Sequence, residues 1–306
     1  MSGSEITPDE FGQIAELFRP LTRGAPEALS LLDDAAVVPS RPGWDLVITK
    51  DAMVAGVHFR ADEAPGLIAQ KLMRANLSDL AAKGAEPFGY FLMTAWSPDF
   101  DWQKRKAFAK GLELDGVQFG VSLLGGDTVS TPGPLTVSMT ALGWVPAGAM
   151  VRRDSAAVGD FIVVSGPIGD GWLDWGLGQG PRLPVPRLDL RDDLRKYASA
   201  AADVSDGLIA DAGRITIASG LGFRLDLAKM PISMDAQAWI ATQSDSAVAR
   251  LRLATAGDDY ELVCAVRPEY ADQFGLKVIG EVLDHGREII FGAQVLDVGD
   301  GGWVHP

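Results

Sequence analysis

Apolar residues recur along the chain at two spacings, and these predict two kinds of element. Spacing typical of one helix face predicts helices over residues 11–18, 65–83, 99–114 and 206–219. Short apolar runs predict strands over residues 46–49, 90–95, 121–124, 135–145, 161–165, 262–266, 277–282 and 288–291. Because both kinds of segment are interleaved along the chain, the pattern predicts an α/β (α+β) protein.

Capping and stop residues mark the ends of several predicted helices. The first helix is expected to begin with Thr7 as a hydroxyl cap and Pro8 at the first helical position, and to stop at Pro20. Gly84 and Gly220 are expected to close two of the later helices.

Segments rich in proline and glycine indicate how the chain is divided. A length of 306 residues fits two domains or one large one. Val145–Gly148 is the best candidate linker, which predicts domains over residues 1–146 and 147–306. Gly176–Pro186 is predicted to be an exposed loop.

Composition excludes several classes of protein. Hydrophobic residues make up 47% of the chain, so a full core is expected. The net charge of −14 argues against a nucleic-acid partner and against an anionic membrane surface. The single cysteine, Cys264, lies in an apolar run and is expected to be a core thiol. A polar N-terminus and the lack of a spanning apolar run predict a cytoplasmic protein.

Acidic residues occur in six short clusters that contain Asp33 and Asp34, Asp51, Asp79, Asp127, Asp203 and Asp206, and Asp258, Asp259 and Glu261. Carboxylates repel phosphate, so a cleft rich in acids suits a polyphosphate only when divalent cations lie between the two anions. Mg²⁺ prefers such oxygen ligands. The clusters therefore predict a metal-bridged polyphosphate site.

Each cluster also has a structural interpretation. Asp33 and Asp34 could form an ordinary loop pair. The paired glycines of Gly125–Thr128 could let the backbone approach a ligand closely, with Asp127 at the end of a strand, or they could form a β-turn. Ser205 or Asp206 could be the N-cap of the following helix. Asp79 is harder to explain in this way, because an Asp on an apolar helix face needs a partner when buried.

Read in order, the motifs resemble those of the thiamine-monophosphate kinase family, in the superfamily typified by aminoimidazole ribonucleotide synthetase. They are D-D-A-A-V-V, D-A-M-V-A-G-V-H-F, N-L-S-D-L-A-A-K-G-A, G-G-D-T, D-V-S-D-G-L and G-D-D-Y-E-L. The usual P-loop and dinucleotide-binding motifs are missing from the sequence. The resemblance implies a two-domain fold, an N-terminal domain that pairs in a homodimer, and several Mg²⁺ ions. It implies phosphoryl transfer from ATP to thiamine monophosphate.

The resemblance also assigns residues by motif position. Metal ligands would be Asp34, Thr49, Lys50, Asp51, Asp79, Asp127, Asp203 and Asp206. ATP contacts would be Gly126, Asp127, Arg153 and Ser205, and thiamine-phosphate contacts would be His58, Asp258 and Trp303. Of these, Asp51, Asp79 and Asp127 are expected to be essential for catalysis.

The chain departs from the family pattern at Leu32, Lys50, Asp258 and the pair Trp172 and Trp175. A lysine cannot offer a side-chain oxygen to Mg²⁺, so Lys50 is expected to offer its backbone carbonyl and turn its side chain away from Thr49 and Asp51, toward solvent or an acid. Two alternatives to the kinase stay open. One is another ATP-using synthetase of the superfamily, and the other is a non-catalytic Mg-nucleotide-binding protein.

Overall fold

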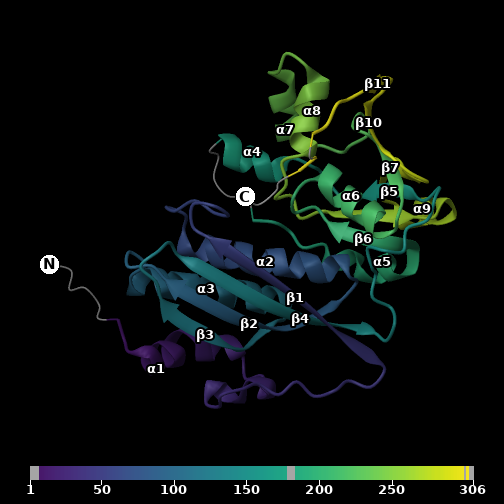
Figure 1. Ribbon diagram of the computed structural model, residues 1–306. Coiled ribbons are helices and arrows are strands. Elements are labelled where there is room, and N and C mark those ends of the chain that lie inside the picture. The colour runs from purple at the N-terminus through teal and green to yellow at the C-terminus, as the bar shows by residue number, and fades with distance from the viewer. Residues whose placement is uncertain (1–6, 178–182, 300, 303–306) are drawn as a thin grey trace. The chain divides into compact units, whose positions relative to one another are not determined.

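The computed structural model describes residues 7–177, 183–299 and 301–302, and the chain divides into two compact units (Figure 1). The N-terminal unit contains residues 1–80 and 86–148, and the C-terminal unit contains residues 81–85 and 149–306. Each unit combines helices with a β-sheet, which confirms the predicted α/β class. In the described ranges, no helix is long and apolar enough to cross a membrane.

The N-terminal unit is built on a four-stranded sheet in the order β1-β4-β2-β3. Its strands are β1 (Trp44–Val54), β2 (Glu86–Trp96), β3 (Ser122–Ser130) and β4 (Thr136–Pro146). β4 pairs antiparallel with β1 and β2, whereas β2 and β3 run parallel. All four were predicted, but β1 continues past Asp51 to Val54 because its eleven residues all pair with β4.

Two long helices, α2 (Pro65–Ala82) and α3 (Trp102–Phe119), cover one face of this sheet (Figure 1). The helices approach closely at Gly66 and Gly111, where a Cβ on Gly111 would lie 2.3 Å from the carbonyl oxygen of Gly66. α2 matches its predicted helix, and Gly84 follows it with a φ of +67°. α3 begins later than predicted, because Asp101 caps its first turn through the amide of Lys104, and it ends later, at the left-handed Gly120.

The N-terminal segment is helical but differs from its prediction. It contains α1 (Glu10–Gln13), the π-helix η1 (Ile14–Phe18) and the 3₁₀-helices η2 (Arg19–Thr22) and η3 (Pro26–Leu31). Asp9, rather than Thr7, caps α1 by accepting the amide of Gly12 at 2.8 Å. Pro20 does not stop the segment, because it lies in the first turn of η2, where its missing N–H costs nothing.

The C-terminal unit contains a seven-stranded sheet in the order β11-β10-β7-β9-β5-β8-β6. Its strands are β5 (Phe161–Val164), β6 (Ala198–Asp203), β7 (Gly222–Asp226), β8 (Leu262–Val266), β9 (Lys277–Leu283), β10 (Arg287–Phe291) and β11 (Gln294–Val295). Its helices are α4 (Asp170–Leu177), the 3₁₀-helix η4 (Leu188–Leu190), α5 (Arg191–Tyr197), α6 (Leu208–Ala218), α7 (Met234–Ala241), α8 (Ser246–Ala254) and α9 (Pro268–Phe274). The predicted loop over residues 176–186 begins inside α4, and residues 178–182 lie outside the described residues.

Both faces of this sheet are buried. Ile162 and Val164 of β5 pack into one apolar cluster, whereas Val163 packs into another with Cys264. This explains the continuous apolar runs of the central strands, since a strand covered on both sides has no polar face. Cys264 is a free, buried thiol as predicted, and burial raises its pKa to about 12.

Candidate functional site

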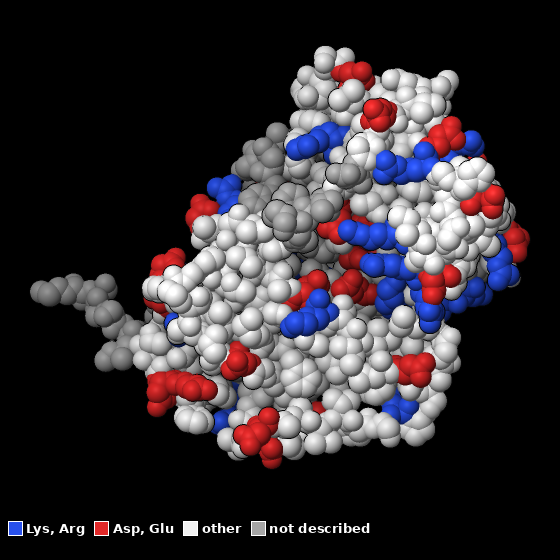
Figure 2. All heavy atoms as spheres, in the orientation of Figure 1, with Lys and Arg blue, Asp and Glu red and all other residues white. Residues whose placement is uncertain are grey.

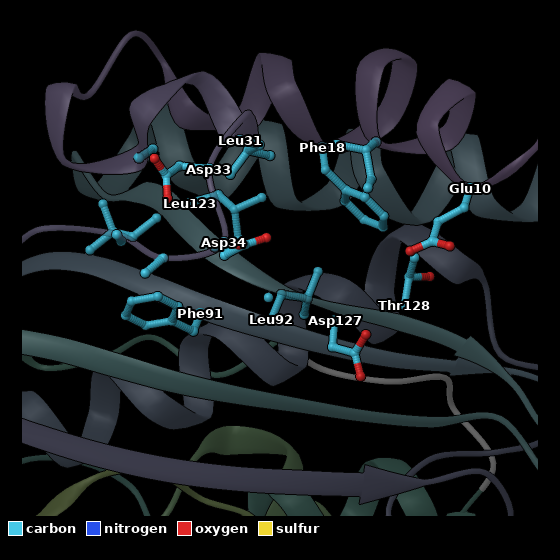
Figure 3. A pocket seen from close by; sticks show the side chains of 17 residues that line it. Glu10, Phe18, Leu31, Asp33, Asp34, Phe91, Leu92, Leu123, Asp127 and Thr128 are labelled. Carbon is cyan, nitrogen blue, oxygen red and sulfur yellow. The ribbon is translucent and has the colours of Figure 1, made fainter.

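A pocket of about 330 Å³ in the N-terminal unit joins two of the predicted acidic motifs (Figure 3). Asp33 and Asp34 line it from the segment after η3, and Gly126 and Asp127 line it from β3. Apolar side chains complete the wall, and Figure 3 labels Phe18, Leu31, Phe91, Leu92 and Leu123 among them. The pocket therefore combines an apolar lining with carboxylates from segments far apart in the sequence.

Gly126 and Asp127 lie inside β3, which continues through the glycine pair to Ser130. The interpretation as a β-turn, and the placement of Asp127 at the end of a strand, are therefore wrong. The strand continues because its backbone pairs with β2 as far as Trp96. A Cβ on Gly126 would lie 1.9 Å from the carbonyl oxygen of Leu92, so only glycine fits at this close approach.

Thr49 and Asp79 meet between the sheet and α2. The Thr49 hydroxyl donates a hydrogen bond of 2.5 Å to Oδ2 of Asp79. Asp79 is half-buried, so the hydroxyl meets part of the need of this carboxylate for a partner. Two predicted metal ligands from distant segments are thus in direct contact.

The register of the sheet divides the predicted ligands between its two faces. Thr49 and Asp51 alternate with exposed residues of β1 and lie on the helix-covered face. Asp127 lies opposite Met93, and Met93 lies opposite Ser138. This places Asp127 on the other face, because directly paired residues point to the same side of a sheet.

Lys50 lies on the face opposite Thr49 and Asp51, as expected from strand alternation. Its side chain is exposed, and Nζ donates to the Ser138 hydroxyl at 2.8 Å. The same hydroxyl donates to the backbone carbonyl of Asp51 at 2.8 Å. The exposed side chain agrees with the expected turn toward solvent, and its hydrogen-bond partner is a serine rather than an acid.

His58 stabilises the turn that follows β1. Its Nδ1 accepts the amide of Val54 at 3.0 Å, and its carbonyl accepts from Nζ of Lys71 at 3.0 Å. The Val54 contact fixes the tautomer, since Nδ1 must be unprotonated and the proton must be on Nε2.

In the C-terminal unit, the residues from Asp203 to Gly207 connect β6 to α6. The N-cap position is Gly207, and no side chain caps the helix, so the assignment of Ser205 or Asp206 as the cap is wrong. Instead, Oδ2 of the buried Asp211 accepts the amides of Ser205, Asp206 and Gly207 at 3.1, 3.0 and 3.2 Å. Burial raises the pKa of Asp211 to about 6, and Arg214 opposes this shift.

The Asp258 segment packs against this connection. The amide of Asp258 donates to the carbonyl of Ser205 at 2.8 Å, and the amide of Tyr260 donates to that of Val204 at 2.8 Å. Asp258 and Tyr260 have φ values of +64° and +54°, which are rare for residues with a side chain. The structure thus brings together Ser205 and Asp258, which were assigned to different ligands.

Asp259 holds the turn before α4. Its carboxylate accepts the amide of Gly169 at 2.8 and 3.0 Å and that of Gly171 at 3.2 Å. Burial raises the pKa of Asp259 to about 8, and these two amides act in the opposite direction. Asp259 was predicted only as a member of an acidic cluster, and no role was predicted for Asp211 or Arg214, because these contacts leave no spacing signal in the sequence.

Arg153 presents a buried donor. Among the described residues, its Nε is buried without a hydrogen-bond partner. A guanidinium N–H in that state favours an anionic ligand, because an unpaired buried donor is costly. Trp303, the remaining assigned residue, lies outside the described residues.

The residues assigned as metal ligands offer the donor atoms that Mg²⁺ prefers. Carboxylate, hydroxyl and carbonyl oxygens make up the whole set. Within the described part of the chain, no group of three or more His, Cys, Asp or Glu is placed to hold a metal ion. That finding is compatible with Mg²⁺, which is usually held by one or two carboxylates together with water and substrate phosphates.

Two family models match the chain. The N-terminal domain of AIR synthase related proteins matches residues 32–145, and their C-terminal domain matches residues 182–292. A thiamine-monophosphate kinase of Caulobacter vibrioides is 52% identical over 97% of this chain and 91% of that protein.

Solved structures show the same architecture. A thiamine-monophosphate kinase from Stenotrophomonas maltophilia K279a is 32% identical, with a TM-score of 0.79 over 94% of this chain and 98% of that one. Escherichia coli HypE, a hydrogenase maturation protein, is 20% identical with a TM-score of 0.77 over 94% and 98%. The fold is therefore shared by proteins with different names.

Proposed function

Since this chain belongs to the family of thiamine-monophosphate kinases, we propose that it transfers the γ-phosphoryl group of ATP to thiamine monophosphate. The observation that carries the proposal is the 52% identity over 97% of the chain to a kinase of that name. A phosphate oxygen of thiamine monophosphate attacks the γ-phosphorus while the bond from that phosphorus to the departing ADP oxygen breaks. The products are thiamine diphosphate and ADP.

The nucleotide would be contacted by Gly126, Asp127, Arg153 and Ser205. The apolar wall beside Gly126 supports this role, because nucleotide pockets need apolar surface for the base. The buried Nε of Arg153 has no acceptor among the described residues, which suits a phosphate. Ser205 would use its hydroxyl, since Asp211 accepts its amide and its carbonyl accepts the amide of Asp258.

Mg²⁺ would be held by oxygens of Asp34, Thr49, Lys50, Asp51, Asp79, Asp127, Asp203 and Asp206. Lys50 would contribute only its backbone carbonyl, because its ammonium bonds Ser138 on the opposite face. When bound, Mg²⁺ neutralises charge on the phosphates. The Thr49 hydroxyl orients Asp79 through its 2.5 Å hydrogen bond.

Thiamine monophosphate would be held by His58, Asp258 and Trp303. The left-handed backbone of Asp258 supports this role, because strain of this kind clusters at functional sites. His58 would offer its Nε2 proton to the substrate, since Nδ1 accepts the amide of Val54.

The fold alone does not distinguish a kinase from the alternative functions, because HypE has the same fold. The 52% identity favours the kinase over another ATP-using synthetase or a non-catalytic nucleotide-binding protein. The expected cytoplasmic location stays a prediction.

The N-terminal domain, residues 1–146, would bind metal and ATP and form a homodimer, and residues 147–306 would complete the ATP and substrate sites. An apolar surface supports the dimer: Leu46 and Ile48 of β1 are exposed on the face that α2 and α3 leave open. In Figure 2, the N-terminal unit shows mostly uncharged side chains on the face in view, while Lys and Arg gather over the C-terminal unit.

One assay tests the activity. The protein is incubated with ATP, Mg²⁺ and thiamine monophosphate, and thiamine diphosphate and ADP are expected in equal amounts. Appearance of AMP or free phosphate in place of these products would reject the proposal.

Two variants separate catalysis from folding in this assay. Asp79→Asn keeps an acceptor for Thr49, so we expect a parent-like melting temperature with most of the turnover lost. Asp115→Asn breaks the ion pair between the buried Asp115 and the partly exposed Arg74, which should cost about 3 kcal/mol of stability. Near-normal turnover in Asp79→Asn would make Asp79 a structural residue.

A further inference from the structure

Arg214 bridges two carboxylates beneath the start of α6. One of its terminal nitrogens, Nη1, lies 2.5 Å from Oδ2 of Asp206, and the same nitrogen donates to Oδ1 of Asp211. Asp211 is fully buried, whereas Asp206 and Arg214 are partly exposed. Arg214 therefore links the buried carboxylate of Asp211 to the carboxylate of Asp206, which is partly exposed to solvent.

The roles of the two residues differ. Oδ2 of Asp211 accepts three consecutive amides, so it shapes the backbone from Ser205 to Gly207 without help from Arg214. Arg214 makes its two ion pairs with side chains alone. Loss of Arg214 should therefore leave the backbone in place and release only the carboxylate of Asp206.

We propose that Arg214, anchored by Asp211, is a positioning residue that holds Oδ2 of Asp206 and directs Oδ1 toward a divalent metal ion. The inference rests on the proposed function, in which Asp206 is a metal ligand. A ligating carboxylate is oriented by hydrogen bonds from outside the metal shell, and removal of such a bond weakens metal affinity.

The charges around Arg214 indicate that it orients the Asp206 carboxylate and does not compete with the metal ion for it. A lone cation beside Asp206 would repel Mg²⁺ and compete for the carboxylate. Arg214 does not act as a lone cation, because its contact with the buried Asp211 pairs its charge. The pair can therefore orient Asp206 with little change in the charge that the metal meets.

The test measures Mn²⁺ binding to the full chain in the absence of nucleotide. Water-proton relaxation reports how much Mn²⁺ is bound. We expect Arg214→Gln to weaken Mn²⁺ affinity about tenfold with a parent-like melting temperature. Arg214→Lys should recover part of the loss, since an ammonium keeps the charge. The matched control is Arg224→Gln, because Arg224 also bridges two acids, Glu281 and Glu288, and is similarly exposed. Its affinity should equal that of the parent.

Either of two results with Arg214→Gln would overturn the inference. Parent-like Mn²⁺ affinity in Arg214→Gln, with or without a lower melting temperature, would make the pair purely structural. Tighter binding in that variant would show that Arg214 competes with the metal. Asp206→Asn and the thiamine-monophosphate assay separate this failure from that of the proposed function. An active parent whose Mn²⁺ affinity is unchanged by Asp206→Asn would reject the metal role of Asp206 and our inference while leaving the kinase intact.

Discussion

Lys50 shows how strand alternation separates two neighbours with opposite charges. Its ammonium bonds the Ser138 hydroxyl on one face of the sheet, while Thr49 and Asp51 lie on the other. We therefore expect Lys50→Thr to keep turnover within about threefold of the parent, with the same Mg²⁺ requirement. Steady-state kinetics over a range of Mg²⁺ concentrations measure both quantities.

Ser138→Ala is the control for this prediction, because it removes the hydroxyl that bonds Lys50 and the Asp51 carbonyl. Its effect should be equally small. A roughly hundredfold loss in Lys50→Thr, about 2.7 kcal/mol of transition-state stabilisation, would show that the ammonium acts on phosphate.

Asp259 makes stability depend on pH. Burial raises its folded-state pKa from 3.8 to about 8. At pH values between these two pKa values, the folded protein therefore keeps a proton on Asp259 that the unfolded chain has lost. The contribution to stability is full below about pH 4 and is lost as pH rises toward 8. Asp259→Asn removes this titration, and an amide oxygen can still accept from Gly169. The melting temperature of the parent should therefore fall, relative to Asp259→Asn, as pH rises through this window.

Asp272→Asn is the matched control, since it changes an exposed carboxyl of the same unit. Its melting temperature should follow that of the parent at every pH. A parent and an Asp259→Asn variant with parallel pH profiles would show that Asp259 is ionised throughout.

The motifs in the sequence identified the acidic residues of the candidate site, but they did not predict which side chains and amides contact those acids. Asp79 was identified because a carboxylate on an apolar helix face needs a partner, and Thr49 provides one. Asp211 gave no such signal, because it lies inside α6 and accepts amides of the segment just before that helix, a contact that matches no standard N-cap pattern. Long-range contacts, such as that between the amide of Gly169 and Asp259, leave no spacing signal in the sequence either.

At the scale of elements, the apolar runs predicted eight strands, and each is present in the structure. β6, β7 and β11 were missed, and β6 was missed because its sequence, A-S-A-A-A-D, is rich in alanine, which has low strand preference. It is a strand because it pairs with β8 along its length. β3 was predicted too short, since a glycine pair indicates a turn unless a neighbouring backbone requires the glycines.

Gly126 of β3 lies where β3 and β2 approach each other closely, so a side chain at this position should separate the two strands. A Cβ on Gly126 would lie 1.9 Å from the carbonyl oxygen of Leu92, so Gly126→Ala must push β3 away from β2. We expect a loss of at least about 2 kcal/mol in the free energy of unfolding, together with weaker ATP binding. Urea unfolding and a nucleotide-binding titration measure the two effects.

Gly133→Ala provides the comparison. The nearest atom to its Cβ would be the Thr131 hydroxyl oxygen at 3.4 Å, which a small shift accommodates. Its stability should stay within about 0.5 kcal/mol of the parent. Equal stability of the two alanine variants would show that β3 can move from β2 without cost.

At the scale of the whole molecule, the open face of the N-terminal sheet predicts self-association. Ile48 is 60% exposed on β1, beside Leu46, on the face that the helices leave uncovered. Exposed apolar side chains such as these favour pairing with a second copy, most often about a two-fold axis. We expect the parent to sediment as a dimer at micromolar concentration and Ile48→Glu to sediment as a monomer, because the dimer would bury its charge without a partner.

Val117 on α3 supplies the matched control for the dimer, since it is 64% exposed and equally apolar but lies on a helix that covers the other face of the sheet. Val117→Glu should therefore remain dimeric, and both variants should keep the melting behaviour of a folded protein. A monomeric parent would contradict the dimer outright. Dissociation by Val117→Glu but not by Ile48→Glu would instead place the contact on the helices, because only the surface that the partner covers can be sensitive to a buried charge.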